Sequence, residues 1–338
     1  MRGLIKIMIV VSAVIGFGSC NWFRTVDNFD KSNSQGAPYE LILVANNQQW
    51  NGPLGDTLRA ILTSAVPVLN QTEPLFDIYR VLPSSFKDLV AKHRNVLVVD
   101  INPKYKEPIL GVQYDVYSAP QIVVTLGAAN DQVATEYVWT NREALLQVLE
   151  MAERDRSIAN GKKYFEKGLW QLINKKFGID MYVPRGYVLR NEKDDFVWIS
   201  YEMPQSSMGF FMYSYPYTGP QDLTLQSLLA ARNKYAAYIP GPSEGSYMTT
   251  ADVYEPDYST YRIEGRLWAE LRGFWDVAGD YMGGPFVSYT TVNTQTNEVI
   301  TLDCYVYSPS LPKRNYMRSL EHLKYLISFP GDAPQKTE

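Results

Sequence analysis

Residues 195–217 read DFVWISYEMPQSSMGFFMYSYPY, and this run sets the architecture of the C-terminal half of the chain. Two segments in it, 195–203 and 209–217, are rich in Tyr, Trp, Phe and Val, and turn-forming residues separate them. Side chains of this kind at this spacing are typical of β-strands joined by a short connection. A third such segment, 183–190, precedes them. We therefore expect three neighbouring antiparallel strands.

The same sheet is expected to continue toward the C-terminus, with one helix inserted. Residues 222–238 have the pattern of an amphipathic helix, and strands are predicted after it at 260–277, 285–293 and 297–307. Pro312 then stands at the first position of a closing helix, where proline is well tolerated. This order predicts a helix-backed, mostly antiparallel sheet.

The N-terminal half alternates short apolar runs with segments of helical periodicity. Two sequences, beginning at Ser85 and Thr140, have the form of capping boxes. The helix after Thr140 is expected to run, bent near Gly161, to Phe177. Strands are predicted at 40–45, 76–82, 95–101 and 121–126, and a further helix at 53–65.

These patterns predict an α+β protein of two domains. The first, 38–178, is expected to be an α/β sandwich, and the second, 179–332, a helix-backed antiparallel sheet followed by a tail at 333–338. A chain of this length fits two domains of about 100 to 200 residues each. The chain has only two cysteines, Cys20 and Cys304. If Cys20 is modified, no intramolecular disulfide can form, and the packed core must supply the stability.

The first twenty residues have the layout of a secretion signal. Arg2 and Lys6 precede an apolar and small-residue run, 7–18, that stops at Ser19 and Cys20. The run is shorter than the about 20 residues that span a bilayer, so cleavage is expected rather than retention. The end of the run resembles the bacterial lipobox, which implies a signal peptide at 1–19 and a lipid on Cys20. Residues 20–37 are polar and are expected to form a tether.

A lipid on Cys20 would make membrane lipid the first partner of the protein, because two or more acyl chains anchor firmly. The tether lacks an acidic cluster after Cys20, and by resemblance to Bacteroidetes lipoproteins this favours the periplasmic face of the outer membrane. After cleavage 30 basic residues remain against 36 acidic ones, a formal charge of −6. This acidic balance does not indicate a nucleic acid partner.

Three stretches of the second half carry a family resemblance: Arg272 to Trp275, Met282 to Phe286, and Tyr305 to Tyr307. With Gly55 to Leu58 and Glu73 to Phe76, they make the chain similar to an uncharacterised lipoprotein family of the Bacteroidetes, catalogued as a domain of unknown function. The resemblance implies export and a common lineage over the whole mature chain. It supplies no catalytic residue.

Catalytic patterns are weak. Gly241 to Gly245 fits the G-x-S-x-G motif with Ser243 as a nucleophile and His322 as its base, but a helix rather than a strand precedes it. Cys304 is expected on an apolar strand face, where burial makes a thiol inert. His322 is expected at the solvated surface. Two histidines and no H-E-x-x-H cannot build a His-rich zinc site. Metals with oxygen ligands remain possible, but Asp252, Glu255 and Asp257 lack the calcium-loop spacing and its glycine, so a solvated loop is favoured and we expect neither a metal nor a cofactor.

The clearest candidate for a binding surface lies on the predicted strand 260–277. One face of this strand is apolar and is expected in the core, and the opposite face carries both charged and aromatic side chains. It is read either as cross-strand ion pairing on a wet sheet face or as a partner surface, because Trp and Arg anchor interfaces. Two glycine-rich segments, 245–248 and 279–285, are either plain turns or loops flanking a pocket. The candidate binding residues are Arg266, Trp268, Arg272, Phe274, Tyr281 and Met282.

The leading functional hypothesis is therefore a non-enzymatic envelope lipoprotein that binds another envelope component, a protein or a glycan, through its second domain. The alternative is a glycan-binding module or a carboxylate-dependent glycan hydrolase, motivated by 13% aromatic residues and many Asp and Glu. A hydrolase needs two carboxylates about 5 to 10 Å apart in one cleft. A serine hydrolase at Ser243 is a third alternative.

Overall fold

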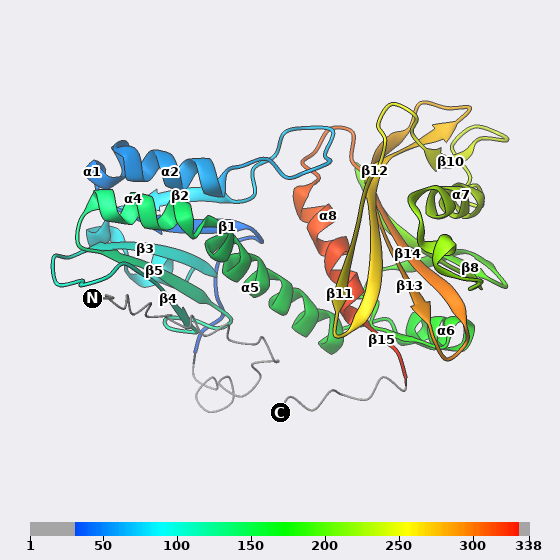
Figure 1. Cartoon of the computed structure of the whole chain (residues 1–338), viewed down its shortest axis with the longest axis horizontal. Helices are drawn as coiled ribbons and strands as arrows, with labels where there is room; N and C mark the ends of the chain where they lie inside the picture. Colours follow the sequence, from blue (N-terminus) through cyan, green and yellow to red (C-terminus); the bar gives the residue numbers. More distant parts are fainter. Residues whose placement is uncertain (1–30, 331–338) are drawn as a thin grey trace, which may run out of the picture.

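The computed structural model describes residues 31–330. The chain folds into two packed units that lie side by side, with the long helix α5 (Arg142–Lys163) reaching from the first toward the second (Figure 1). The predicted signal peptide, Cys20 and the start of the tether lie outside the described residues. Within 31–330, no helix combines the length and apolarity needed to cross a membrane.

The first unit is a five-stranded sheet in the order β2-β1-β3-β5-β4. All neighbours are parallel except the edge strand β4, which runs antiparallel to β5. Helix α2 (Pro53–Leu62) and helix α4 (Asp131–Thr140) pack with α5 on one face, and Phe86 and Val90 pack on the other. The central strands are therefore buried on both sides, as parallel sheets require. The strands are β1 (Glu40–Val44), β2 (Asp77–Val81), β3 (Asn95–Ile101), β4 (Ile109–Tyr114) and β5 (Ile122–Ala128).

Short helices complete the first unit. Helix α1 (Asn47–Asn51) carries a capping box formed by Asn46 and Gln49. The two capping boxes expected at Ser85 and Thr140 do not form: Lys87 precedes α3 (Asp88–Ala91) without a side-chain cap, and Thr140 is the last residue of α4. The 3-10 turn η3 (Pro83–Ser85) occupies the place of the first predicted cap.

The second unit is an eight-stranded antiparallel sheet, in the order β10-β12-β13-β14-β9-β8-β7 with β11 paired to β12. The predicted helix-backed antiparallel sheet, and with it the α+β class, is confirmed. Every pair in the sheet is antiparallel. The strands are β7 (Val188–Lys193), β8 (Phe196–Met203), β9 (Ser206–Pro216), β10 (Tyr247–Thr250), β11 (Asp257–Ile263), β12 (Arg266–Ala278), β13 (Gly283–Asn293) and β14 (Glu298–Tyr307).

Helices cover both faces of this sheet. Helix α7 (Leu225–Ala236), preceded by the 3-10 turn η4 (Pro220–Leu223), packs on one face. Helix α6 (Lys167–Phe177), helix α8 (Arg314–Glu321) and the 3-10 turn η5 (His322–Leu326) pack on the other. Two short strands, β6 (Asp180–Met181) and β15 (Ile327–Ser328), pair beside it. The burial of both faces explains why no residue of β13 or β14 is exposed.

The predicted bent helix from Thr140 to Phe177 is two separate helices, α5 and α6, and Thr140 itself is the last residue of α4. The expected bend near Gly161 is instead an end: α5 stops at Lys163, and the chain turns before α6 begins at Lys167. Leu169, Ile173 and Phe177 of α6 belong to the core of the second unit. Helix α6 therefore packs with the second sheet, although the predicted boundary at residue 178 places it in the first domain.

The predicted strand 260–277 is wrong in its continuity. Glu264 and Gly265 both have positive φ, 49° and 80°, and form a two-residue turn that splits the segment into the hairpin β11–β12. Such turns require left-handed conformations, which glycine adopts easily. The sequence Glu-Gly was not recognised as a turn because charged and aromatic residues continue the alternation on both sides of it.

Candidate functional site

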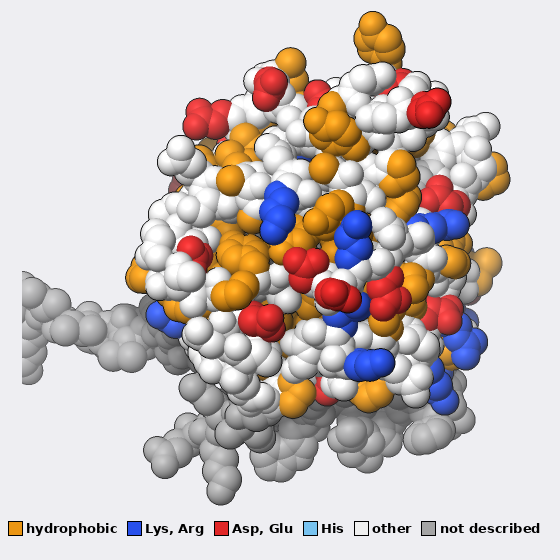
Figure 2. Space-filling model, turned by 90° about the vertical axis from the view of Figure 1, so that its right-hand side faces the viewer, with side chains coloured by type: hydrophobic (Ala, Val, Ile, Leu, Met, Phe, Trp, Pro, Cys, Tyr) orange, Lys and Arg blue, Asp and Glu red, His pale blue; other side chains and the backbone are white. Residues whose placement is uncertain are grey.

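A cleft of about 870 Å³ opens at one end of the second sheet. Its walls come from the β8–β9 turn, from residues 239–242 after α7, and from the ends of β12 and β14. Figure 2 shows the face that lies at the right of Figure 1, on the second unit, with hydrophobic side chains frequent between scattered charged ones. Met248 and Met282 line the cleft, one from each of the two glycine-rich segments singled out in the sequence. Most other lining side chains are aromatic, proline or aliphatic.

Four aromatic side chains form the fixed part of the cleft. Trp275 meets Tyr305 edge to face, with ring centroids 5.7 Å apart, and the centroid of the Tyr307 ring lies 6.3 Å from that of Trp275. Trp198 Nε1 donates a hydrogen bond to the Tyr305 hydroxyl (2.8 Å), and Trp275 Nε1 donates to the carbonyl of Val306 (3.2 Å). Because the polar atoms of Trp198, Trp275 and Tyr305 are bonded, these three rings are held in place before any ligand arrives.

Burial raises the pKa of Tyr305 above its ordinary value, although the hydrogen bond from Trp198 opposes the shift. The phenol therefore stays neutral at physiological pH and acts as a hydrogen-bond acceptor for Trp198. Tyr305 is 3% exposed. It is a wall of the cleft and not a base.

Among the described residues that line the cleft, Glu202 alone carries a charge. Its Oε1 accepts hydrogen bonds from Ser200 Oγ (2.7 Å) and Ser207 Oγ (3.0 Å), and Arg190 lies 3.8 Å from the same oxygen. The side chain is 49% exposed, so solvent reaches it. A glycosidase needs a second facing carboxylate, and the described lining supplies none.

The six candidate binding residues do not come together on an exposed face. Trp268 is 5% exposed, because α8 and the segment around Phe329 cover that side of the sheet. Arg272 is held between Glu270 and Glu321, and the guanidinium of Arg266 lies 3.7 Å from the centroid of the Phe329 ring. The expected Trp268 and Arg272 patch is therefore wrong. Of the remaining three, Phe274 packs against Tyr254, Tyr281 is fully exposed, and Met282 lines the cleft.

The structure does not assemble a serine hydrolase site at Ser243. Ser243 lies in the loop after α7, and its hydroxyl donates to Asp280. That hydrogen bond lowers the pKa of Asp280, which makes the carboxylate a poor base. His322 lies at the junction of the two units, with Tyr39 and Glu150 as neighbours.

His322 is buried, at 4% exposure, and the expectation of a solvated surface histidine is wrong. It faces the first unit rather than solvent because η5, which begins at His322, packs against α5. Cys304 is buried as predicted, and burial raises the pKa of its thiol. Within residues 31–330, no three His, Cys, Asp or Glu side chains form a group that could hold a metal ion.

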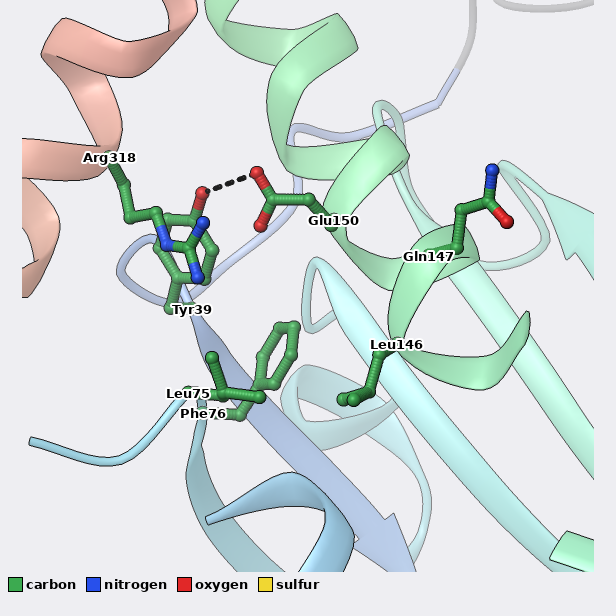
Figure 3. A pocket seen from close by; sticks show the side chains of 7 residues that line it. All are labelled: Tyr39, Leu75, Phe76, Leu146, Gln147, Glu150 and Arg318. Atoms are coloured by element: carbon green, nitrogen blue, oxygen red, sulfur yellow. Dashed lines mark hydrogen bonds between the residues drawn. The ribbon is translucent and has the colours of Figure 1, made fainter. Parts of the chain in front are cut away.

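A smaller pocket of about 230 Å³ lies at the junction of the units (Figure 3). Arg318 of α8 lies beside the ring of Tyr39, whose hydroxyl donates to Glu150 Oε1 (3.2 Å). The ring nitrogen Nε2 of His322 is 3.2 Å from the same oxygen. Burial raises the pKa of Tyr39. The polar groups that line this pocket thus already bond to one another, which fits a structural contact between the units better than a ligand site.

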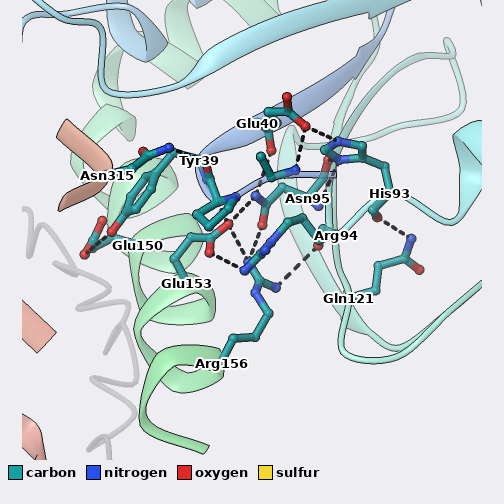
Figure 4. Close-up of polar contacts among 12 residues, drawn as sticks. Tyr39, Glu40, His93, Arg94, Asn95, Gln121, Glu150, Glu153, Arg156 and Asn315 are labelled. Carbon is teal, nitrogen blue, oxygen red and sulfur yellow. Dashed lines mark hydrogen bonds and ion pairs between the residues drawn. The ribbon is translucent and has the colours of Figure 1, made fainter. Parts of the chain in front are cut away.

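Glu153 of α5 is the centre of a second polar cluster (Figure 4). Its Oε1 accepts from Asn95 Nδ2 (2.7 Å) and from the backbone N–H of Tyr39 (3.2 Å), and its Oε2 accepts from Arg94 (2.6 Å). Arg156 pairs with the same carboxylate at 2.9 Å. A buried carboxylate with this many donors is satisfied. The cluster fixes α5, and therefore the junction, to the first sheet.

The first unit also caps a helix of the second. Helix α8 has no cap from its own N-terminal residue Lys313. Instead Glu73 accepts the backbone N–H of Lys313 (2.6 Å) and that of Arg314 (2.9 Å), one on each carboxylate oxygen. A carboxylate at a helix N-terminus is favourable both as a cap and through the helix dipole. The two units are therefore joined by directed hydrogen bonds.

Residues 166–325 match the family model described as a domain of unknown function (DUF4837), and residues 34–162 match a second one, DUF8532. No curated protein matches the chain. Solved structures with some likeness include LpqN, involved in cell envelope biogenesis of Mycobacterium tuberculosis (15% identity, 44% of this chain, 82% of that chain, TM-score 0.28). Another is the lipid transfer and protein localization domain of human StarD13 (10% identity, 47% of this chain, 95% of that chain, TM-score 0.22). At these TM-scores neither likeness supports an argument about function.

Proposed function

We propose that this protein is an exported, lipid-anchored binding protein of the bacterial cell envelope, of the Bacteroidetes lipoprotein family that its sequence resembles. Its second unit binds an apolar ligand in the aromatic cleft. The observation that carries the binding proposal is the cleft itself: about 870 Å³, with four aromatic walls, three of them held by hydrogen bonds, and a single carboxylate among the described lining residues. Concave, mostly apolar sites with few polar groups are typical of small-ligand binding.

Replacing Cys20 by alanine should move the protein from the membrane fraction to the soluble fraction. The reason is that the acyl chains, at about 0.8 kcal/mol for each buried CH₂ group, provide the membrane affinity. Fractionation of cells followed by immunoblotting measures this. A Cys304→Ala variant is the matched control and should stay with the membrane, since Cys304 is buried. If the Cys20→Ala protein remains membrane-bound, the lipid anchor is excluded.

Binding in the cleft is testable with N-phenylnaphthylamine, a neutral apolar dye that fluoresces in apolar sites. The full-length wild-type protein should bind it saturably, and Trp198→Ala should weaken binding by about tenfold, because loss of an aromatic anchor costs more than about 1 kcal/mol. Trp139→Ala is the matched control, since Trp139 is exposed on α4 of the first unit. Equal binding by both variants and wild type would place the dye elsewhere and refute the cleft.

A glycan-binding module is the second candidate. The cleft combines aromatic rings with Gln205, Ser206, Ser207 and Ser310, and rings with nearby hydroxyl groups suit sugars. Displacement of N-phenylnaphthylamine by soluble oligosaccharides would favour this reading over an apolar ligand. A glycan hydrolase is not proposed, because Glu202 has no facing carboxylate among the described lining residues.

A further inference from the structure

The register of the second sheet places the charge of the cleft beside an aromatic wall. Glu202 of β8 is paired with Ser207 of β9, and Ser207 is paired with Tyr307 of β14. Residues paired across neighbouring strands project on the same face, about 5 Å apart per strand. All three line the cleft. The short side chain of Ser207 therefore leaves a notch between a carboxylate and an aromatic ring.

The carboxylate of Glu202 has one oxygen, Oε2, that is available to accept a hydrogen bond from a ligand. The contacts from Ser200, Ser207 and Arg190 all go to Oε1 of Glu202, and no described residue bonds Oε2. An unbonded, half-exposed carboxylate oxygen is a ready acceptor for a charged N–H donor. The Ser207 hydroxyl is already committed to Oε1.

Tyr307 supplies the second element that a cation requires. The electron-rich face of an aromatic ring attracts an ammonium group within about 6 Å of its centroid, and more strongly where water is excluded. Trp275 stands 6.3 Å from Tyr307 and is 2% exposed, so the ring system extends from the notch into the apolar part of the cleft. A cleft with a charged group at one end and apolar surface beyond it is complementary to an amphiphilic ligand.

We propose that the cleft binds a ligand with an organic ammonium group on an apolar chain, the ammonium lying over Ser207 between Glu202 Oε2 and the ring of Tyr307. This inference rests on the proposed function of the cleft and names its ligand class. Arg190, 3.8 Å from Oε1, offsets part of the charge of Glu202. A ligand with the opposite charge, recognised by Arg190, is the competing outcome that the experiment separates.

The experiment compares three probes with the same eight-carbon chain: octylammonium, 1-octanol and octyl sulfate. Each is titrated below its aggregation concentration into the full chain carrying Cys20→Ala, and Trp fluorescence is followed. Octylammonium should bind about tenfold more tightly than 1-octanol, and octyl sulfate most weakly. Glu202→Gln should remove the advantage of octylammonium and leave 1-octanol unchanged. Glu244→Gln, at an exposed carboxylate in the nearby loop, is the matched control and should change neither.

Tyr307 gives a second, independent readout. Tyr307→Phe keeps the ring and should retain the preference for octylammonium, whereas Tyr307→Leu should reduce it several-fold with little effect on 1-octanol. Equal binding of all three probes would overturn the ammonium site while leaving the apolar cleft in place. Tightest binding of octyl sulfate would also overturn it and would point to Arg190. Absence of binding by any probe would refute the cleft function along with the inference.

Discussion

Replacing Arg232 by methionine is expected to lower the free energy of unfolding by about 3–5 kcal/mol, the range for breaking a buried ion pair from one side. Arg232 of α7 and Asp303 of β14 are both fully buried, and Arg232 Nε donates to Asp303 Oδ2 at 2.9 Å. Its guanidinium also donates to Thr250 Oγ1 (2.8 Å) and lies 3.6 Å from the centroid of the Phe286 ring. Methionine fills much of the space but leaves the carboxylate without its cation.

The pH dependence identifies the cause. Burial raises the pKa of Asp303 to about 6, while Arg232 holds it down. Without Arg232 the pKa climbs further, so the folded variant binds a proton that the unfolded chain, with a pKa near 3.8, has released. Stability must then fall as the pH rises. Between pH 7 and pH 8, above the folded pKa of Asp303 in the wild type, the variant should still lose stability while this group leaves the wild type nearly unchanged.

Urea unfolding at several pH values measures both effects, with far-UV circular dichroism as the signal. The control is the double variant Arg232→Met with Asp303→Leu, which removes both charges from the core. Replacement of a buried pair by apolar residues is often neutral, so the double variant should be more stable than Arg232→Met alone. A double variant less stable than the single one would show that packing of α7, and not the unpaired carboxylate, dominates.

The strands of the second unit could be predicted because alternation and aromatic content are local properties. The runs at 195–203 and 209–217 correspond closely to β8 and β9. The edge strand β4 escaped prediction, since its burial pattern has no buried position to give it an apolar face. Helix ends were also not predicted where the capping residue is distant in the sequence, as with Glu73, which caps the N-terminus of α8. No local sequence pattern contains a contact of that range.

The cleft could not be predicted from the sequence because it, too, depends on contacts between residues that are far apart in the chain. Trp198, Trp275, Tyr305 and Glu202 come from three strands, and only the register of the sheet brings them to one end. The face of 260–277 was misjudged because period-two alternation distinguishes two faces but does not say whether the second is wet. Here α8 covers it, and Trp268 is core. The glycine-rich segments around Met248 and Met282 were the local signal that bordered the cleft.

Glu321→Gln is expected to cost about 3 kcal/mol, the lower end of the range for a broken buried pair, because water still reaches part of its partners. Glu321 of α8 accepts from Arg272 on Oε1 and from Arg318 on Oε2 (3.1 Å). Its side chain is 7% exposed. Glutamine keeps the shape but leaves two guanidinium groups beside a neutral amide. Glu143→Gln, at an exposed residue of α5 paired only with Arg142, is the matched control.

The cost of Glu321→Gln should vanish in acid. Burial pushes the pKa of Glu321 up, but Arg272 and Arg318 outweigh it and lower the pKa from 4.5 to about 2. A carboxylate with a depressed folded pKa contributes its full stability above the unfolded pKa and loses it as the pH falls toward the folded one. The difference in free energy of unfolding between wild type and variant should therefore be constant above about pH 5 and shrink steadily at pH 4 and pH 3. Urea unfolding at these pH values measures it, and a difference that stays constant down to pH 3 would mean that the ionised carboxylate is not what stabilises α8.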